Sequence, residues 1–164
     1  MLKLTGIMMI LVSDFFIVKY ILEGRQREIS FIKDLIIFLK ALSIEIIDLK
    51  RPLYEAITAN KGVISHEIDE LVDKFEKNED SPREAIISTI NNINLIDENT
   101  KKPILEYLNI AGRTTKEGME GFLSVTLNTL NYILEDKIEK NRNSKKTVNA
   151  TVYSLSILFV IFIM

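Results

Sequence analysis

The chain has 164 residues, of which 47% are hydrophobic and 27% charged, and its mean hydropathy is +0.13. Its net charge of −2 gives no reason to expect a nucleic-acid partner, and the absence of cysteine excludes disulfides, thiolate metal sites and cysteine nucleophiles. High hydropathy combined with many charges predicts that apolar and charged residues occupy separate parts of the chain.

The first segment, residues 1–23, is apolar and predicts a transmembrane helix that ends near Gly24. A cleaved signal peptide is the alternative, but the end of the segment lacks the small residues of a cleavage site. Asp14 would lie near the middle of the bilayer. There it would either pair with a polar group on a partner helix or be accommodated by water and bilayer adjustment.

Residues 24–146 predict a cytoplasmic helical bundle that begins with a helix from Arg25 to about Lys50. One apolar face of this helix carries Ile29, Ile32, Ile36, Leu39, Leu42, Ile46 and Leu49. A second apolar stripe, which includes Phe38 and Ile44, lies off that face. A helix that is apolar on two sides is typical of a bundle centre, and the alternative is that the second stripe binds another protein or a second copy.

Cap and turn residues divide the rest of the bundle. A short helix over residues 53–59 is expected to stop at Gly62, and the next helix to begin after Ser65. A capping box over residues 81–84 predicts a helix that runs to about residue 96, and a turn is expected over 97–100. A helix over 101–111 is then closed by Gly112, and a second capping box at 114–117 begins a long helix. The expected fold is all-α, a small antiparallel helical bundle flanked by an N-terminal and a C-terminal transmembrane helix.

The helix after Ser65 carries an acidic face made of Glu67, Asp69, Glu70, Asp73 and Glu76. Such a face is either a docking surface for a basic partner or simply solvated. As a docking surface it would use Asp69, Glu70 and Asp73 as candidate partner-binding residues.

Residues 147–164 predict the second transmembrane helix, because the run is uncharged and follows a collar of basic residues between Lys137 and Lys146. A buried core helix is the alternative. Few basic residues lie on the outer flanks of the two spans and many lie on the inner flanks. This distribution places the bundle in the cytoplasm and both termini outside.

No pattern of catalytic or cofactor-binding residues is present. His66, the only histidine, is followed by Glu70 on the same helical face, but a second histidine for a zinc motif is missing. Walker, dinucleotide-binding and nucleophile-elbow motifs are also missing. We therefore expect no enzyme activity, no metal and no cofactor.

Several short strings recur in the order and spacing of one known family. They are Met1–Leu4 with Gly6, Arg25–Ile29, Ile32–Leu35, Leu39–Ile46, Pro52–Ala56, Gly112 with Thr115–Glu117, and the final apolar run. On these strings the chain resembles stage III sporulation protein AB of endospore-forming bacteria along nearly its whole length.

The resemblance implies a non-enzymatic membrane platform in the channel complex between mother cell and forespore. Its bundle would be similar to the cytoplasmic domains of the platform proteins of type II secretion and type IV pilus systems. The implied partners are a cytoplasmic ATPase like stage III sporulation protein AA and other membrane proteins of the complex. The apolar spans add the lipid bilayer as a partner, and the second apolar stripe leaves a homo-oligomer as an alternative. The implied location is the outer forespore membrane, on the mother-cell side. The alternative function is a membrane-tethered regulatory or ligand-sensing protein, which requires a polar-lined pocket inside the bundle.

Overall fold

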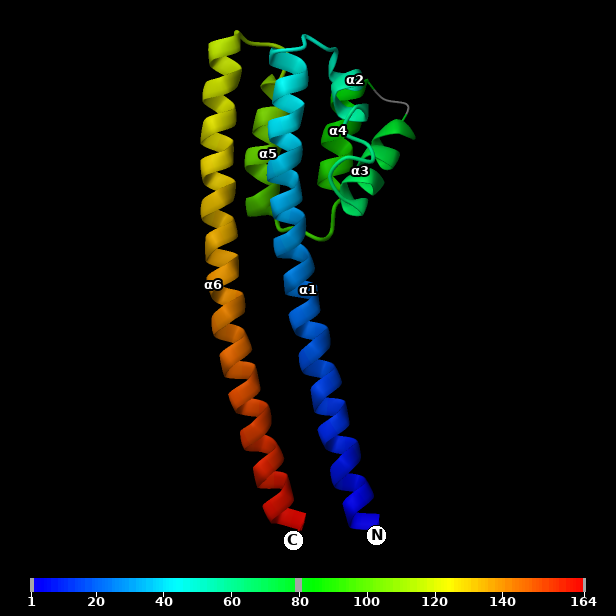
Figure 1. Ribbon diagram of the computed structural model, residues 1–164, viewed down its shortest axis with the longest axis vertical. Coiled ribbons are helices and arrows are strands. Elements are labelled where there is room, and N and C mark those ends of the chain that lie inside the picture. The colour runs from blue at the N-terminus through cyan, green and yellow to red at the C-terminus, as the bar shows by residue number, and fades with distance from the viewer. Residues whose placement is uncertain (1, 79–80, 164) are drawn as a thin grey trace. The chain divides into compact units, whose positions relative to one another are not determined.

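The computed structural model describes residues 2–78 and 81–163. It describes the backbone alone at residues 2–11, 14–15, 17–18, 21, 148–149, 152–153 and 155–163. Within the described residues the fold contains six helices and no strand, which confirms the all-α prediction (Figure 1). The helices are α1 (Leu2–Ile47), α2 (Leu53–Thr58), α3 (His66–Glu76), α4 (Pro82–Asn91), α5 (Glu98–Ile110) and α6 (Lys116–Ile163).

The chain forms two compact units. The first unit, Met1–Ile29 with Asp136–Met164, contains the beginning of α1 and the end of α6. The second, Ser30–Glu135, contains α2 to α5 and the remaining parts of α1 and α6.

Within the described residues, no helix contains a stretch that is long and apolar enough to cross a membrane. Most side chains of the two predicted spans, residues 1–23 and 147–164, lie outside the described set, as does the side chain of Asp14.

The predicted helix end near Gly24 is wrong, because α1 continues through this position without a break. A glycine ends a helix when it adopts the left-handed conformation and caps the last carbonyls. The described glycines with a positive φ are Gly62 (75°) and Gly112 (74°), and these two do follow α2 and α5 as predicted. Gly24 instead stays helical, at a cost of about 1 kcal/mol relative to alanine.

Side-chain caps begin α3, α4 and α5, whereas α2 begins after Pro52 without one. The Ser65 hydroxyl accepts a hydrogen bond from the backbone N–H of Ile68 at 3.4 Å, and the Ser81 hydroxyl donates to a Glu84 carboxylate oxygen at 2.8 Å. Two boundaries differ from the prediction. α4 ends at Asn91 rather than near residue 96, and α5 begins at Glu98 because Asp97 caps it instead of belonging to a turn.

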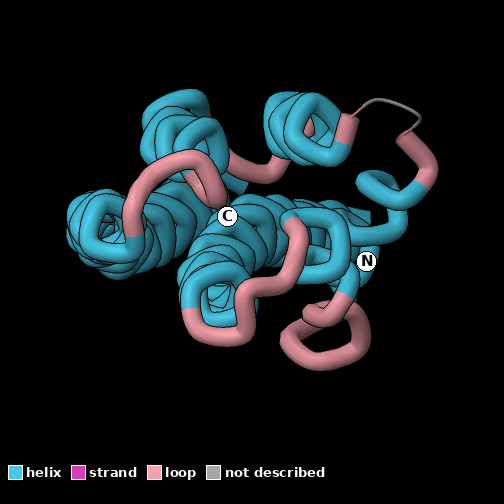
Figure 2. Tube along the Cα trace, turned by 90° about the horizontal axis from the view of Figure 1, so that it is seen from above, coloured by secondary structure: helices cyan, strands magenta, loops and turns pink. Residues whose placement is uncertain are grey.

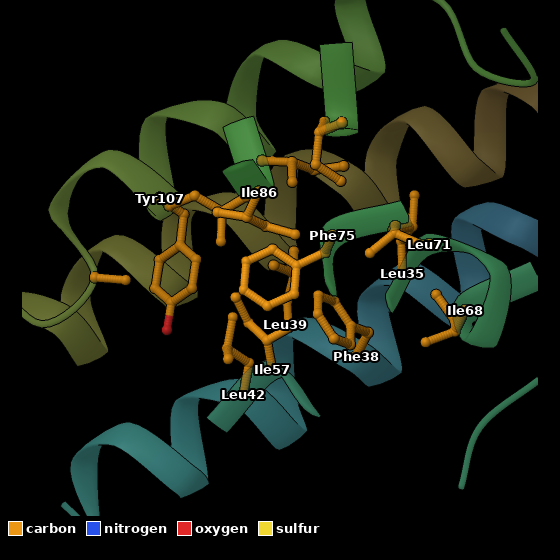
Figure 3. Close-up of a cluster of buried hydrophobic side chains, with 14 of the residues drawn as sticks. Leu35, Phe38, Leu39, Leu42, Ile57, Ile68, Leu71, Phe75, Ile86 and Tyr107 are labelled. Atoms are coloured by element: carbon orange, nitrogen blue, oxygen red, sulfur yellow. The ribbon is translucent and has the colours of Figure 1, made fainter. Parts of the chain in front are cut away.

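The core of the second unit is apolar and receives side chains from all six helices. Figure 3 shows a part of it to which α1, α2, α3, α4 and α5 contribute. Fully buried examples, one from each helix in order, are Leu39, Ile57, Phe75, Ile86, Tyr107 and Leu130. Burial raises the pKa of the Tyr107 hydroxyl. The unit is therefore held together by contacts among helices that are distant in sequence, with α1 contributing the largest share of the core.

Candidate functional surfaces

The acidic face of α3 is partly occupied by contacts within the chain. The Lys61 ammonium lies 2.6 Å from an Asp73 carboxylate oxygen and 2.6 Å from a Glu76 carboxylate oxygen. The Asp69 carboxylate accepts a hydrogen bond from the backbone N–H of Gly62 at 2.6 Å. These contacts fasten the loop between α2 and α3 onto α3.

The hydrogen bonds of this cluster shift the pKa values of its members. The hydrogen bond from Lys61 lowers the pKa of Asp73, and the hydrogen bonds to Asp73 and Glu76 raise the pKa of Lys61. A carboxylate with a lowered pKa stabilises the fold above its ordinary pKa, and this contribution is lost as the pH falls through the lowered value. Asp69 and Asp73 therefore have a structural role that the sequence did not reveal.

The acidic side chains of α3 that are free to face a partner are Glu67 and Glu70, both of which are exposed. Glu70 lies 3.3 Å from the His66 imidazole, and both side chains are largely in solvent. Among the described residues no further histidine or acidic side chain joins them to form a group of three that could hold a metal ion. Of the three predicted partner-binding acids, Asp69, Glu70 and Asp73, only Glu70 does not hold the loop, and its contact is with the exposed His66 of the same helix.

The structure separates Phe38 from Ile44, which the sequence placed in one stripe. Phe38 is 1% exposed and lies in the core, whereas Ile44 is 54% exposed. Ile37 is also exposed, and so are Lys33 and Lys40 on the same side of α1. The surface available to a partner here is therefore a mixed basic and apolar stripe without Phe38.

A polar groove lies between α1 and α6 within the first unit. Its side-chain ion pair joins Glu28 and Lys137 at 2.6 Å, and both side chains are mostly buried. The cavity has a volume of about 320 Å³ and is lined by Arg25, Glu28, Ile29, Lys137, Lys140, Asn141 and Ser144. The sequence alone does not reveal this groove, because its two sides are more than a hundred residues apart, although the basic collar is a partial signal.

Comparison with known proteins identifies a family. The model of the family described as Stage III sporulation protein AB matches residues 3–164. No curated protein and no solved structure matches the chain.

Proposed function

The chain belongs to the stage III sporulation protein AB family, and from this membership we propose that it is a non-enzymatic membrane platform of the channel complex between mother cell and forespore. Residues 1–23 and 147–164 would anchor it in the outer forespore membrane. Residues 24–146 would face the mother-cell cytoplasm, where a cytoplasmic ATPase like stage III sporulation protein AA docks.

The observation that supports this proposal most directly is the distribution of polarity in the second unit. Its interior is a continuous apolar core, and several of its buried polar side chains bond to nearby backbone carbonyls. Asn60 bonds to Ala56, and Lys101 bonds to Asn91. An interior of this kind is built for stability, so the function of the unit is expected at its surface.

The ATPase-binding surface that we favour is formed by Glu67 and Glu70 on α3. Both carboxylates are exposed, and neither is used to hold the loop between α2 and α3. Exposed charges contribute little to folding but steer and align a partner of opposite charge. A basic surface on the ATPase would therefore recognise these residues.

Reversing both charges, Glu67→Lys with Glu70→Lys, should weaken ATPase binding about tenfold or more, because like charges are then brought together at the interface. The measurement is the affinity of the full-length chain in nanodiscs for the purified ATPase. The matched control is Glu106→Lys with Glu117→Lys, two exposed acids that change the net charge equally. An equal loss in the control would mean that net charge alone drives binding, and failure of the unmodified chain to bind would exclude the docking role.

The proposed topology predicts which positions are accessible from outside the cell. Because the chain has no cysteine, a single introduced cysteine is a unique label site. On intact cells that carry the chain in their cell membrane, an impermeant thiol reagent should label Leu2→Cys, whereas Val63→Cys should be labelled only after permeabilisation. The opposite pattern would show that the orientation is reversed.

A membrane-tethered regulatory or ligand-sensing protein is the second candidate function, and the groove in the first unit favours it. The groove presents Arg25, Lys140, Asn141 and Ser144 to a cavity large enough for a small polar molecule. The two functions differ in location, since a platform depends on the surface of α3 and a sensor depends on this groove.

A further inference from the structure

The outward face of α6 is unusual between residues 121 and 134, because it has no charge there although charged residues flank it on both sides. Residues 121–134 form a run of 14 residues without a charged side chain, in a chain that is 27% charged. Three large side chains of this run are exposed: Phe122 (50%), Val125 (65%) and Tyr132 (74%). In Figures 1 and 2 this part of α6 forms an edge of the bundle, with no other helix beyond it. Depletion of charge with exposed aromatic residues is typical of the centre of a protein interface.

The exposed residues also follow the spacing of a coiled-coil seam. Positions 118, 121, 125, 128 and 132 alternate by three and four residues, as the a and d positions of a heptad do. The first two are glycines, of which Gly118 is half-exposed, and the apolar side chains of the seam are Val125 and Tyr132. The opposite face of the helix contains Met119, Thr126 and Leu130, which are buried in the bundle. α6 therefore has one face packed in its own bundle and a second, heptad-spaced face with no covering element.

We propose that this seam, residues 118–132 of α6, is the surface on which a second copy of the chain docks, with the two α6 helices parallel. Parallel pairing about a two-fold axis sets each seam residue opposite its own copy, so any charged residue would meet a like charge. Between residues 121 and 132 the seam positions are uncharged, and so are the flanking positions 122, 124, 129 and 131. Asn128 lies at a seam position, where its uncharged amide can hydrogen-bond to the same residue of the second copy.

The other exposed helix faces are less suited to this partner. The free acids of α3 and the lysines of α1, Lys33 and Lys40, would each oppose an identical charge in a parallel pair. The uncharged seam is the face on which self-pairing brings no such repulsion, and this distinguishes a second copy from a charged partner such as the proposed ATPase.

The seam is short, and its length decides where pairing occurs. A run of 14 helical residues extends about 21 Å, which buries much less than the roughly 1,200 Å² of a stable interface between free proteins. Anchoring in one membrane supplies the missing stability by raising the effective concentration and by aligning the helices. The proposal therefore rests on the proposed membrane anchoring and concerns the full-length chain in the bilayer.

Cysteine cross-linking tests the seam directly. The full-length chain carrying Val125→Cys or Tyr132→Cys, in native membranes, should form a disulfide-linked dimer on mild oxidation. Val63→Cys, which is 71% exposed but lies in the loop after α2, should stay monomeric and is the matched control. Adding Asn128→Asp to the Val125→Cys chain should lower the dimer fraction about tenfold or more, because two carboxylates of unchanged size then face each other.

Carbonate extraction of the same membranes separates this proposal from the one on which it rests. A carbonate-resistant chain that fails to cross-link at residue 125 would overturn the seam and leave the anchoring intact. Release by carbonate would overturn the anchoring, and the seam proposal with it. Equal cross-linking at residue 63, no effect of Asn128→Asp, or an adduct with a different protein would each overturn the assignment of a second copy.

Discussion

Replacing Phe38 with alanine should lower the free energy of unfolding by about 3–5 kcal/mol. The side chain is 1% exposed and lies among α1 and α3 residues in the core (Figure 3). Truncation removes its apolar contacts and leaves a cavity that close-packed neighbours fill only in part. The measurement is a urea titration of the purified full-length chain in detergent, followed by helical circular dichroism at a fixed protein concentration.

Ile44→Ala is the matched control, because Ile44 lies on the same helix but is 54% exposed. Its effect should stay within about 0.5 kcal/mol, apart from a small change in helix propensity. Equal losses in the two variants would contradict the buried position of Phe38, and so would retention of stability in Phe38→Ala.

The different burial of Phe38 and Ile44 shows the limit of predicting buried residues from helical periodicity alone. Phe38 and Ile44 are six residues apart, and at about 100° per residue they lie on different sides of α1. Assigning both residues to one second apolar stripe was therefore too coarse. Phe38 points into the bundle, and Ile44 points away from it. Which side was buried depended on the packing of α3 and α5, which a single helix cannot reveal.

Local signals predicted the bundle well because their causes are local. Ser65 and Ser81 cap helices through residues three positions away. Gly112 adopts the left-handed conformation directly after the C-cap of α5, and Gly62 adopts it in the loop after α2. The same reasoning failed at Gly24, where a glycine was taken as a stop although no capping geometry accompanies it.

Contacts between distant residues account for what could not be predicted. Asp69 and Asp73 looked like free surface charges, yet they hold the loop that contains Lys61 and Gly62. The pairing of Glu28 with Lys137 likewise depends on two helices meeting. By contrast, the uncharged run of α6 was visible in the sequence, and the structure added which of its faces is exposed.

Arg83 is the residue with the largest structural role that the sequence did not suggest. It lies in the first turn of α4, and its guanidinium donates hydrogen bonds to the backbone carbonyls of Leu108, Asn109 and Ala111 at the end of α5. Carbonyls at a helix end have no partner in their own helix, and the negative end of the helix dipole favours a cation there. Desolvation by burial, with a smaller contribution from Arg113, lowers the pKa of Arg83, but a guanidinium remains charged at neutral pH.

Arg83→Met should therefore lower the free energy of unfolding by about 2–4 kcal/mol, because it removes charged hydrogen bonds and leaves partly buried carbonyls without a donor. The stability of Arg83→Lys should fall between that of the unmodified chain and that of Arg83→Met. An ammonium keeps the charge but lacks the planar, five-donor geometry that reaches three carbonyls at once. Urea titration of the full-length chain measures both variants, and Arg113→Met, at an exposed position on the same helix end, is the control. A loss in Arg83→Met no larger than in the control, or full rescue by lysine, would show that the three carbonyl contacts do not hold α4 to α5.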